Sequence, residues 1–130
     1  MKRMLRIALA ATLVLGFFQA RFASASPLDG KSFVGQMGEK GKTKGDKDTL
    51  VFKEGRFRST ACDKYGFGDA PYAVKEDGGK MVVTVETTSK KQGTMTWTLT
   101  VDGEALTGIS MWKKGEKAPR EYWVKGSLVK

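Results

Sequence analysis

The stretch Thr94–Trp112 reads TMTWTLTVDGEALTGISMW and predicts two paired β-strands. From Thr94 to Val101 every second residue is a threonine, and the residues between the threonines are apolar. This period of two places the apolar side chains on one face of a strand and the hydroxyl groups on the other. Asp102-Gly103 is a tight-turn dipeptide, so we expect Glu104–Lys113 to return antiparallel to the first strand.

The chain after residue 25 repeats this pattern of short alternating strands and turns. Strands are predicted at Ser32–Met37, Thr49–Lys53, Arg56–Ala61, Tyr72–Lys75, Lys80–Thr88, Thr94–Val101, Ala105–Lys113 and Arg120–Val129. Two connections differ from the tight turns. Gly38–Asp48 contains no apolar residue and is predicted to be a long mobile loop, and the Gly- and aromatic-rich Cys62–Pro71 is predicted to be an irregular corner. No helical period is present in this part of the chain, so the fold class is all-β.

Eight sequential strands with short connections favour an antiparallel meander. An open meander would leave two unpaired edges and one bare face, whereas closure removes both edges. The sequence therefore predicts an eight-stranded up-and-down antiparallel β-barrel. The interior of such a barrel is filled by side chains or holds one small ligand. A two-sheet β-sandwich is the alternative, because sandwiches also show evenly spaced strands.

Residues 1–25 predict a secretory signal peptide. The basic Met1–Arg6 precedes an apolar run, Ile7–Phe18, that is too short to span a bilayer comfortably. Ala23-Ser24-Ala25 matches the small-residue cleavage pattern, so we expect cleavage after Ala25 and export to a bacterial periplasm or beyond. Residues 26–130 suffice for one β-barrel domain, and they contain no further apolar run of membrane-spanning length.

The composition argues against several classes of function. The chain has no histidine, the commonest general base and transition-metal ligand, and most of its 14 acidic residues lie in turns and charged loops. We therefore expect no enzymatic activity, no cofactor and no metal site. Without residues 1–25 the chain keeps 19 basic and 14 acidic residues, a net charge of +5. The basic residues are scattered among acids, so nucleic-acid binding is not expected, but attraction to anionic envelope polymers is one reading.

Cys62 is the only cysteine, so no internal disulfide can form. An unpaired cysteine is commonly small, buried and unreactive. If the strand Arg56–Ala61 kept its alternation, Cys62 would instead share the outward side with Arg58 and Thr60. A bulge would reverse this orientation, and both alternatives stay open at this point.

Aromatic side chains are the best candidates for a binding site. We predict that seven of them line an interior cup and bind a ligand: Phe33, Phe57, Tyr72, Trp97, Trp112, Tyr122 and Trp123. An ordinary aromatic core is the alternative for most of these rings. Tyr122 and Trp123 are adjacent and must point to opposite faces, so we expect one ring outside the barrel or under a loop. The Tyr65–Gly68 corner is expected to place a further ring at the barrel rim.

An exported eight-stranded meander with a long first loop resembles the calycin group, which includes lipocalins, avidins and small bacterial barrel inhibitors. The resemblance covers residues 26–130 in topology. The lipocalin Gly-x-Trp motif is not matched, because Gly30-Lys31-Ser32-Phe33 has its aromatic residue one place late and has no tryptophan.

Our leading hypothesis for function is a binding module that holds a small apolar or amphipathic molecule inside the barrel. The alternative is a protein-interaction module whose partner is an envelope protein. The small bacterial inhibitors of exported metalloproteases are the example, and in them the N-terminal tail enters the protease. Ser26-Pro27-Leu28 is compatible with such a tail, whereas the usual disulfide of those inhibitors cannot form with one cysteine. Several rings on the outer surface would favour the interaction module, and rings that converge inward would favour the binding module.

Overall fold

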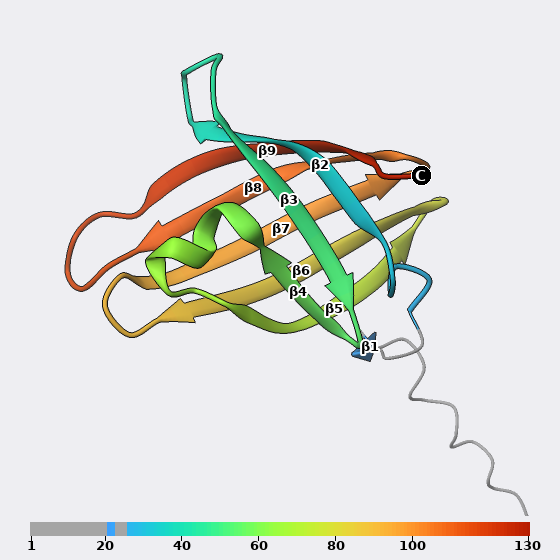
Figure 1. Ribbon diagram of the computed structural model, residues 1–130, viewed down its shortest axis with the longest axis horizontal. Helices are drawn as coiled ribbons and strands as arrows, with labels where there is room; N and C mark the ends of the chain where they lie inside the picture. The colour runs from blue at the N-terminus through green and yellow to red at the C-terminus, as the bar shows by residue number, and fades with distance from the viewer. Residues whose placement is uncertain (1–20, 23–25) are drawn as a thin grey trace, which may run out of the picture.

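The computed structural model describes residues 21–22 and 26–130, and it contains a closed barrel of eight antiparallel strands (Figure 1). The barrel strands are β2 (Ser32–Glu39), β3 (Asp46–Lys53), β4 (Arg56–Ser59), β5 (Asp69–Asp77), β6 (Lys80–Ser89), β7 (Gly93–Asp102), β8 (Ala105–Lys113) and β9 (Arg120–Leu128). A 3-10 helix, η3 (Thr60–Tyr65), lies between β4 and β5.

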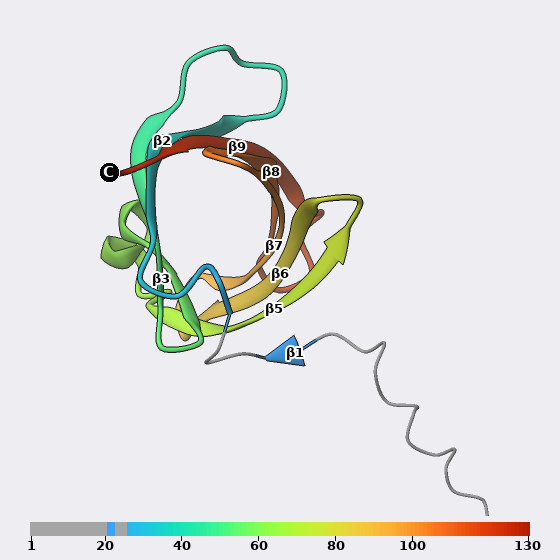
Figure 2. The same cartoon turned by 90° about the vertical axis from the view of Figure 1, so that its right-hand side faces the viewer.

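The barrel is an uninterrupted ring. Each barrel strand pairs antiparallel with the next one in the sequence, and the first strand, β2, pairs with the last, β9 (Figure 2). The predicted up-and-down barrel is confirmed. The alternative of two packed sheets is wrong, because the ladder continues from β5 to β6 and from β2 to β9 without a break.

A two-residue strand, β1 (Arg21–Phe22), pairs with Ala73 and Val74 of β5. It falls within the predicted signal peptide, whose residues 1–20 and 23–25 lie outside the described residues. Cleavage after Ala25 would therefore remove β1 and leave all eight barrel strands in place. In the part of the chain that the structure describes, no helix combines the length and the apolar character that a membrane crossing requires.

The seam between β2 and β9 is in register over seven residue pairs, from Phe33 opposite Leu128 to Glu39 opposite Tyr122. Gly35 lies opposite Gly126 in the middle of this seam. A Cβ atom on Gly35 would overlap the carbonyl oxygen of Lys125 and the Cα atom of Gly126. The two strands can therefore approach to pairing distance only because residue 35 has no side chain.

The alternation predicted for Thr94–Val101 builds one wall of the core. Its inward residues, Met95, Trp97, Leu99 and Val101, are each no more than 4 % exposed. Phe52 lies among other rings, with its ring centroid 5.4 Å from that of Phe57 and 5.0 Å from that of Tyr72. Tilted and edge-on contacts of this kind are favourable aromatic geometries. Together with Phe33, these rings fill the half of the barrel where β2 begins.

The segment before β2 closes this half of the barrel. Leu28 is buried in the core, and Asp29 Oδ1 accepts hydrogen bonds from Tyr72 Oη at 2.6 Å and from the Gly55 amide at 3.0 Å. Burial, together with the Asp29 carboxylate, raises the pKa of Tyr72 to about 12, so the phenol remains a donor. In Figure 2 the segment lies over the lower left part of the end of the ring that faces the viewer. Residues 26–31 are therefore docked on the barrel.

At the end of the barrel opposite residues 26–31, two predicted boundaries between strands and loops were wrong. The pairs Gln36–Lys47 and Met37–Asp46 extend the first hairpin, so its loop spans residues 40–45 rather than Gly38–Asp48. Backbone pairing does not require apolar side chains, and charged residues extend the ladder where they face solvent.

The third strand ends at Ser59 and not at Ala61, because the chain turns into η3. Asp48 Oδ1 accepts a hydrogen bond from the Ala61 amide at 3.0 Å and satisfies a free donor of the first helical turn. The predicted irregular corner Cys62–Pro71 contains most of this helix and the start of β5.

Gly35→Ala is expected to destabilise the barrel at its seam. The added methyl group meets backbone atoms of β9 that cannot move without breaking the ladder, so the free energy of unfolding should fall by about 3 kcal/mol or more. Urea unfolding followed by tryptophan fluorescence measures the change. Gln36→Ala, at an exposed position on the same strand, is the control and should stay within about 0.5 kcal/mol of the wild type. Equal stability of the two variants would contradict this account of the seam.

Candidate functional site

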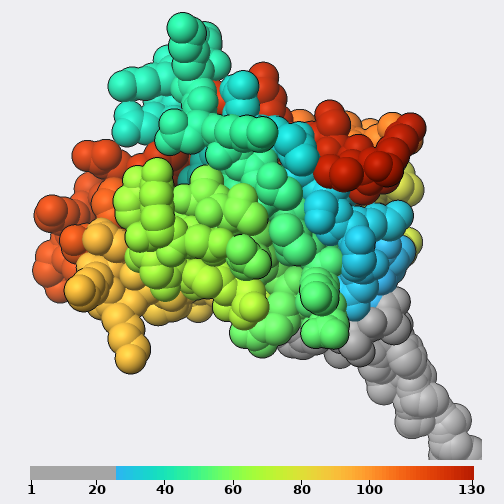
Figure 3. Space-filling model, viewed as in Figure 1, coloured from blue at the N-terminus to red at the C-terminus, as the bar shows by residue number. Residues whose placement is uncertain are grey.

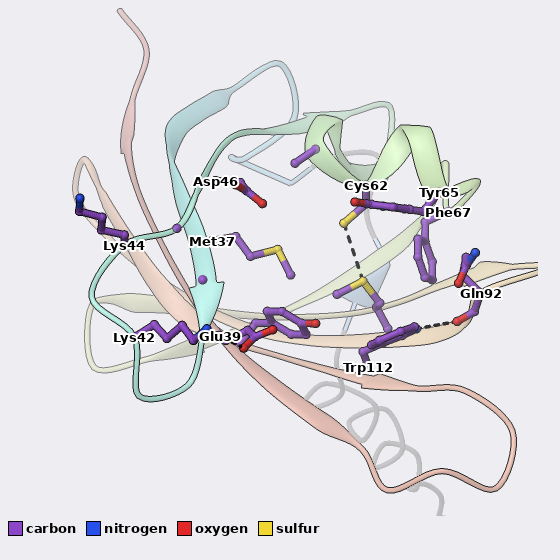
Figure 4. A pocket seen from close by; sticks show the side chains of 15 residues that line it. Met37, Glu39, Lys42, Lys44, Asp46, Cys62, Tyr65, Phe67, Gln92 and Trp112 are labelled. Atoms are coloured by element: carbon purple, nitrogen blue, oxygen red, sulfur yellow. Dashed lines mark hydrogen bonds and ion pairs between the residues drawn. The ribbon is translucent and has the colours of Figure 1, made fainter.

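A pocket of about 590 Å³ opens at the end of the barrel opposite residues 26–31 (Figure 4). Its volume lies within the roughly 300–1,000 Å³ that small-molecule sites occupy. The rim is formed by the 40–45 loop, η3, Gln92 in the turn between β6 and β7, and the ends of β8 and β9 at Trp112 and Tyr122, most of which lie at the left of Figure 1. The 40–45 loop protrudes from the surface in the space-filling view (Figure 3).

The walls are mainly apolar and the rim is mainly polar. Apolar and aromatic lining residues are Met37, Ala61, Cys62, Tyr65, Phe67, Met95, Trp112 and Tyr122. The other lining residues are Gly38, Glu39, Lys42, Lys44, Gly45, Asp46 and Gln92. Such a combination holds an apolar body by contact area and leaves polar groups to orient it.

Two of the seven predicted ligand-binding residues, Trp112 and Tyr122, line the pocket. They lie on the inward faces of β8 and β9, close to the rim. Trp112 Nε1 donates a hydrogen bond to the carbonyl oxygen of Gln92, which fixes the indole against the 90–92 turn (Figure 4).

Four of the predicted residues, Phe33, Phe57, Tyr72 and Trp97, point inward but do not line the pocket. The sequence correctly predicted that these side chains point inward. The alternation of residues does not indicate how far along the barrel axis each side chain lies. They fill the closed half, and Trp97 lies two residues deeper than Met95, which does line the pocket. Trp97 Nε1 donates to Thr87 Oγ1 at 3.0 Å, so its polar group is satisfied within the core.

Trp123, the seventh predicted residue, lies on the outer face of β9 and does not line the pocket. Its Nε1 donates to the carbonyl oxygen of Lys42 at 2.7 Å, and its ring covers Gly38, where a Cβ atom would meet the ring. The Lys125 ammonium group lies 5.3 Å from the ring centroid. The expectation that one ring of the Tyr122-Trp123 pair lies outside or under a loop is confirmed, and this ring anchors the 40–45 loop.

The prediction missed Met37, Met95 and Gln92. Both methionines lie near the rim, on strand faces that were predicted to point inward. Their positions near the strand ends could have identified them as pocket residues. The expectation for the 65–68 corner is confirmed, since Tyr65 and Phe67 both line the pocket.

Cys62 is 6 % exposed, and its Sγ lies 3.7 Å from Met95 Sδ (Figure 4). The outward orientation derived from strand alternation is wrong, because the strand ends at Ser59 and η3 turns the side chain into the barrel. Burial raises the pKa of the Cys62 thiol to about 11, so the protonated form dominates at neutral pH. A protonated thiol is a poor nucleophile and a poor metal ligand.

Asp48 lies on the inner face of β3 and is almost completely buried. Its Oδ2 accepts a hydrogen bond from Ser59 Oγ at 2.6 Å, in addition to the Ala61 amide bonded to Oδ1. Burial raises the pKa of Asp48, and these hydrogen bonds to the charged form limit the rise. The carboxylate thus stabilises the junction between β4 and η3, which forms one side of the pocket.

Ser110 Oγ is buried inside the barrel and has no hydrogen-bond partner among the described residues, and Ser110 does not line the pocket. Ser110 lies on the inward face of β8, paired with Trp97 on one side and Tyr122 on the other. A buried hydroxyl group without a partner costs free energy.

Residues 21–22 and 26–130 contain no group of three or more His, Cys, Asp or Glu side chains that could hold a metal ion. Comparisons of the chain with protein-family models, curated proteins and solved structures gave no match. The resemblance to the calycin group stays a prediction.

Asp48→Asn is expected to change the pH dependence of stability. The raised pKa means that the folded chain binds the Asp48 proton more tightly than the unfolded chain, so ionisation of Asp48 costs stability as the pH rises. The asparagine keeps an acceptor for the Ala61 amide and cannot ionise. The free energy of unfolding of the variant relative to the wild type should therefore increase from about pH 4 to about pH 7. Urea titrations at both pH values test this, and a relative stability that decreases with pH would contradict it.

The Cys62 thiol should react slowly in the folded protein. With its pKa raised to about 11, the thiolate fraction at about pH 8 is roughly 100-fold below that of an ordinary thiol, and burial slows the reaction further. Ellman's reagent in buffer and in denaturing urea measures both rates. Comparable rates in the two conditions would show that the thiol is exposed in the folded state.

Proposed function

We propose that the protein is an exported binding module that holds a small apolar or amphipathic molecule in the pocket at the open end of the barrel. The observation that carries this proposal is the unequal filling of the interior. Aromatic side chains and residues 26–31 close one half, while the other half keeps a pocket of about 590 Å³. The predicted signal peptide supports export to the periplasm or beyond.

The lining residues suit a ligand with an apolar body. Trp112, Tyr122 and Phe67 offer aromatic surface, and Met37 and Met95 offer flexible, polarisable side chains that adapt to different shapes. The polar residues of the rim, among them Lys42 and Gln92, supply the few polar contacts that orient a ligand.

The interaction module has less support. In residues 26–130, Tyr65 is the one large aromatic side chain that is mostly exposed, at 51 %. Most rings converge inward, the arrangement that favours a binding module. Residues 26–31 are docked on the barrel through Leu28 and Asp29 and do not form a free tail for insertion into a protease.

Trp112→Ala should weaken binding of a neutral apolar probe, N-phenyl-1-naphthylamine. Loss of one aromatic wall reduces the binding free energy by roughly 1.5–3 kcal/mol, equivalent to about a 10- to 150-fold rise in Kd. The probe's fluorescence, titrated against protein, measures the change. Val34→Ala is the control, because this exposed apolar side chain on β2 does not line the pocket and its loss should change Kd by less than about threefold. Equal effects of the two substitutions would place the probe elsewhere, and circular dichroism verifies that both variants fold.

Native mass spectrometry of protein recovered from its own envelope identifies a physiological ligand. A small molecule that co-purifies with the wild type and is lost from Trp112→Ala is the expected result.

A further inference from the structure

The net charge of residues 26–130 is concentrated at the end of the barrel where the pocket opens. The four segments around the open end, 39–46, 60–68, 90–92 and 113–121, contain ten basic and five acidic residues. The rest of residues 26–130 contains nine of each sign. The excess of +5 therefore belongs to the open end, whereas the remainder of the domain is balanced.

Three cations of this set are held close to the pocket lining. Lys114 Nζ lies 3.3 Å from Gln92 Oε1, and the Arg120 guanidinium group lies 5.8 Å from the centroid of the Trp112 ring. The Lys42 side chain extends toward Glu39, with 3.7 Å between Nζ and Oε1 (Figure 4). Lys44 also lines the pocket, but its side chain extends away from it in the same view. The cations thus flank the mouth from the 40–45 loop on one side and the 113–121 segment on the other.

Two carboxylates, Glu39 and Asp46, line the pocket, and the cations around the open end outnumber them. Glu39 already lies within 4.0 Å of two cations, Lys42 and Arg120. In residues 26–130, no carboxylate lies within 4.0 Å of the ammonium groups of Lys44, Lys64, Lys90, Lys91, Lys113, Lys114 and Lys117. A concave site rimmed by one sign of charge concentrates ions of the opposite sign and orients them on approach.

We infer that the pocket takes an anionic amphiphile, with its apolar body among Met37, Phe67, Met95, Trp112 and Tyr122 and its acidic head group at the mouth. This inference rests on the proposed function and adds the chemical class of the ligand. The head group is a carboxylate, sulfate or phosphate ester, which lysine ammonium groups and the Arg120 guanidinium group bind with charge-assisted hydrogen bonds.

The test uses four amphiphiles with the same ten-carbon chain and different head groups: decanoate, decyl sulfate, decan-1-ol and decyltrimethylammonium. The full chain, expressed with its own N-terminal segment, is titrated with each amphiphile below its micelle concentration, and displacement of N-phenyl-1-naphthylamine is measured. The two anions should bind about tenfold more tightly than the alcohol, and the cation should bind most weakly. The difference should shrink when the ionic strength is raised from about 0.02 M to about 0.3 M.

Charge reversal at the mouth provides the second arm. Lys42→Glu combined with Lys114→Glu should lower the affinity for decanoate about tenfold and raise that for decyltrimethylammonium, with little change for decan-1-ol. Lys53→Glu combined with Lys75→Glu is the matched control, because both lysines are exposed on the strands near the closed end and the net charge changes equally. This control should leave all four affinities within about twofold of the wild type, because screening weakens charges that are more than a Debye length from the mouth.

The outcomes separate this inference from the proposed function. If decan-1-ol binds as tightly as the anions, the inference of an anionic head group is wrong, and the pocket is still a binding site. Failure of all four amphiphiles and of the probe to bind overturns both. Co-sedimentation with phosphatidylglycerol vesicles, without binding of the monomeric amphiphiles, would assign the positive end to a membrane surface and overturn the inference.

Discussion

The pairing of β2 with β9 is the constraint on which the rest of the structure depends. Without it the same eight strands would form an open sheet with two unpaired edges, and no side would be enclosed. The seam requires close backbone contact, which Gly35 permits because it has no side chain. A barrel of eight strands has an interior that side chains can fill or leave partly free. This chain does both, in different halves.

The two halves differ because large rings and the chain segment before β2 are placed at one end. Phe33, Phe52, Phe57 and Tyr72 lie near the end where residues 26–31 dock. At the other end, η3 and the 40–45 loop line the pocket. Asp48 holds one of these rim elements and Trp123 holds the other. Both residues act through hydrogen bonds to the backbone, so the rim is part of the folded structure.

The distribution of charge follows the same division. The four segments around the open end carry the whole excess of positive charge, while the rest of residues 26–130 carries balanced charge. Lysine side chains at the open end keep the mouth solvated and discourage association between copies at this end. Because these lysines surround an apolar pocket, we infer that they bind the acidic head group of its ligand. A similar excess spread evenly over the surface would indicate only solubility.

The sequence by itself determined the class of fold, the number of strands and the inward face of most of them. A period of two in stretches such as Thr94–Val101 leaves one arrangement that buries the apolar residues, and closure follows from the cost of open edges. Two features of the candidate site depended on long-range contacts. The end of β4 at Ser59, which turns Cys62 inward, depends on a hydrogen bond to Asp48 on another strand. The choice of Trp112 and Tyr122, rather than Phe57 and Trp97, as pocket residues depends on depth along the barrel. Alternation specifies the face of a strand but not the height on it, so only the tertiary structure could decide which inward rings meet a ligand.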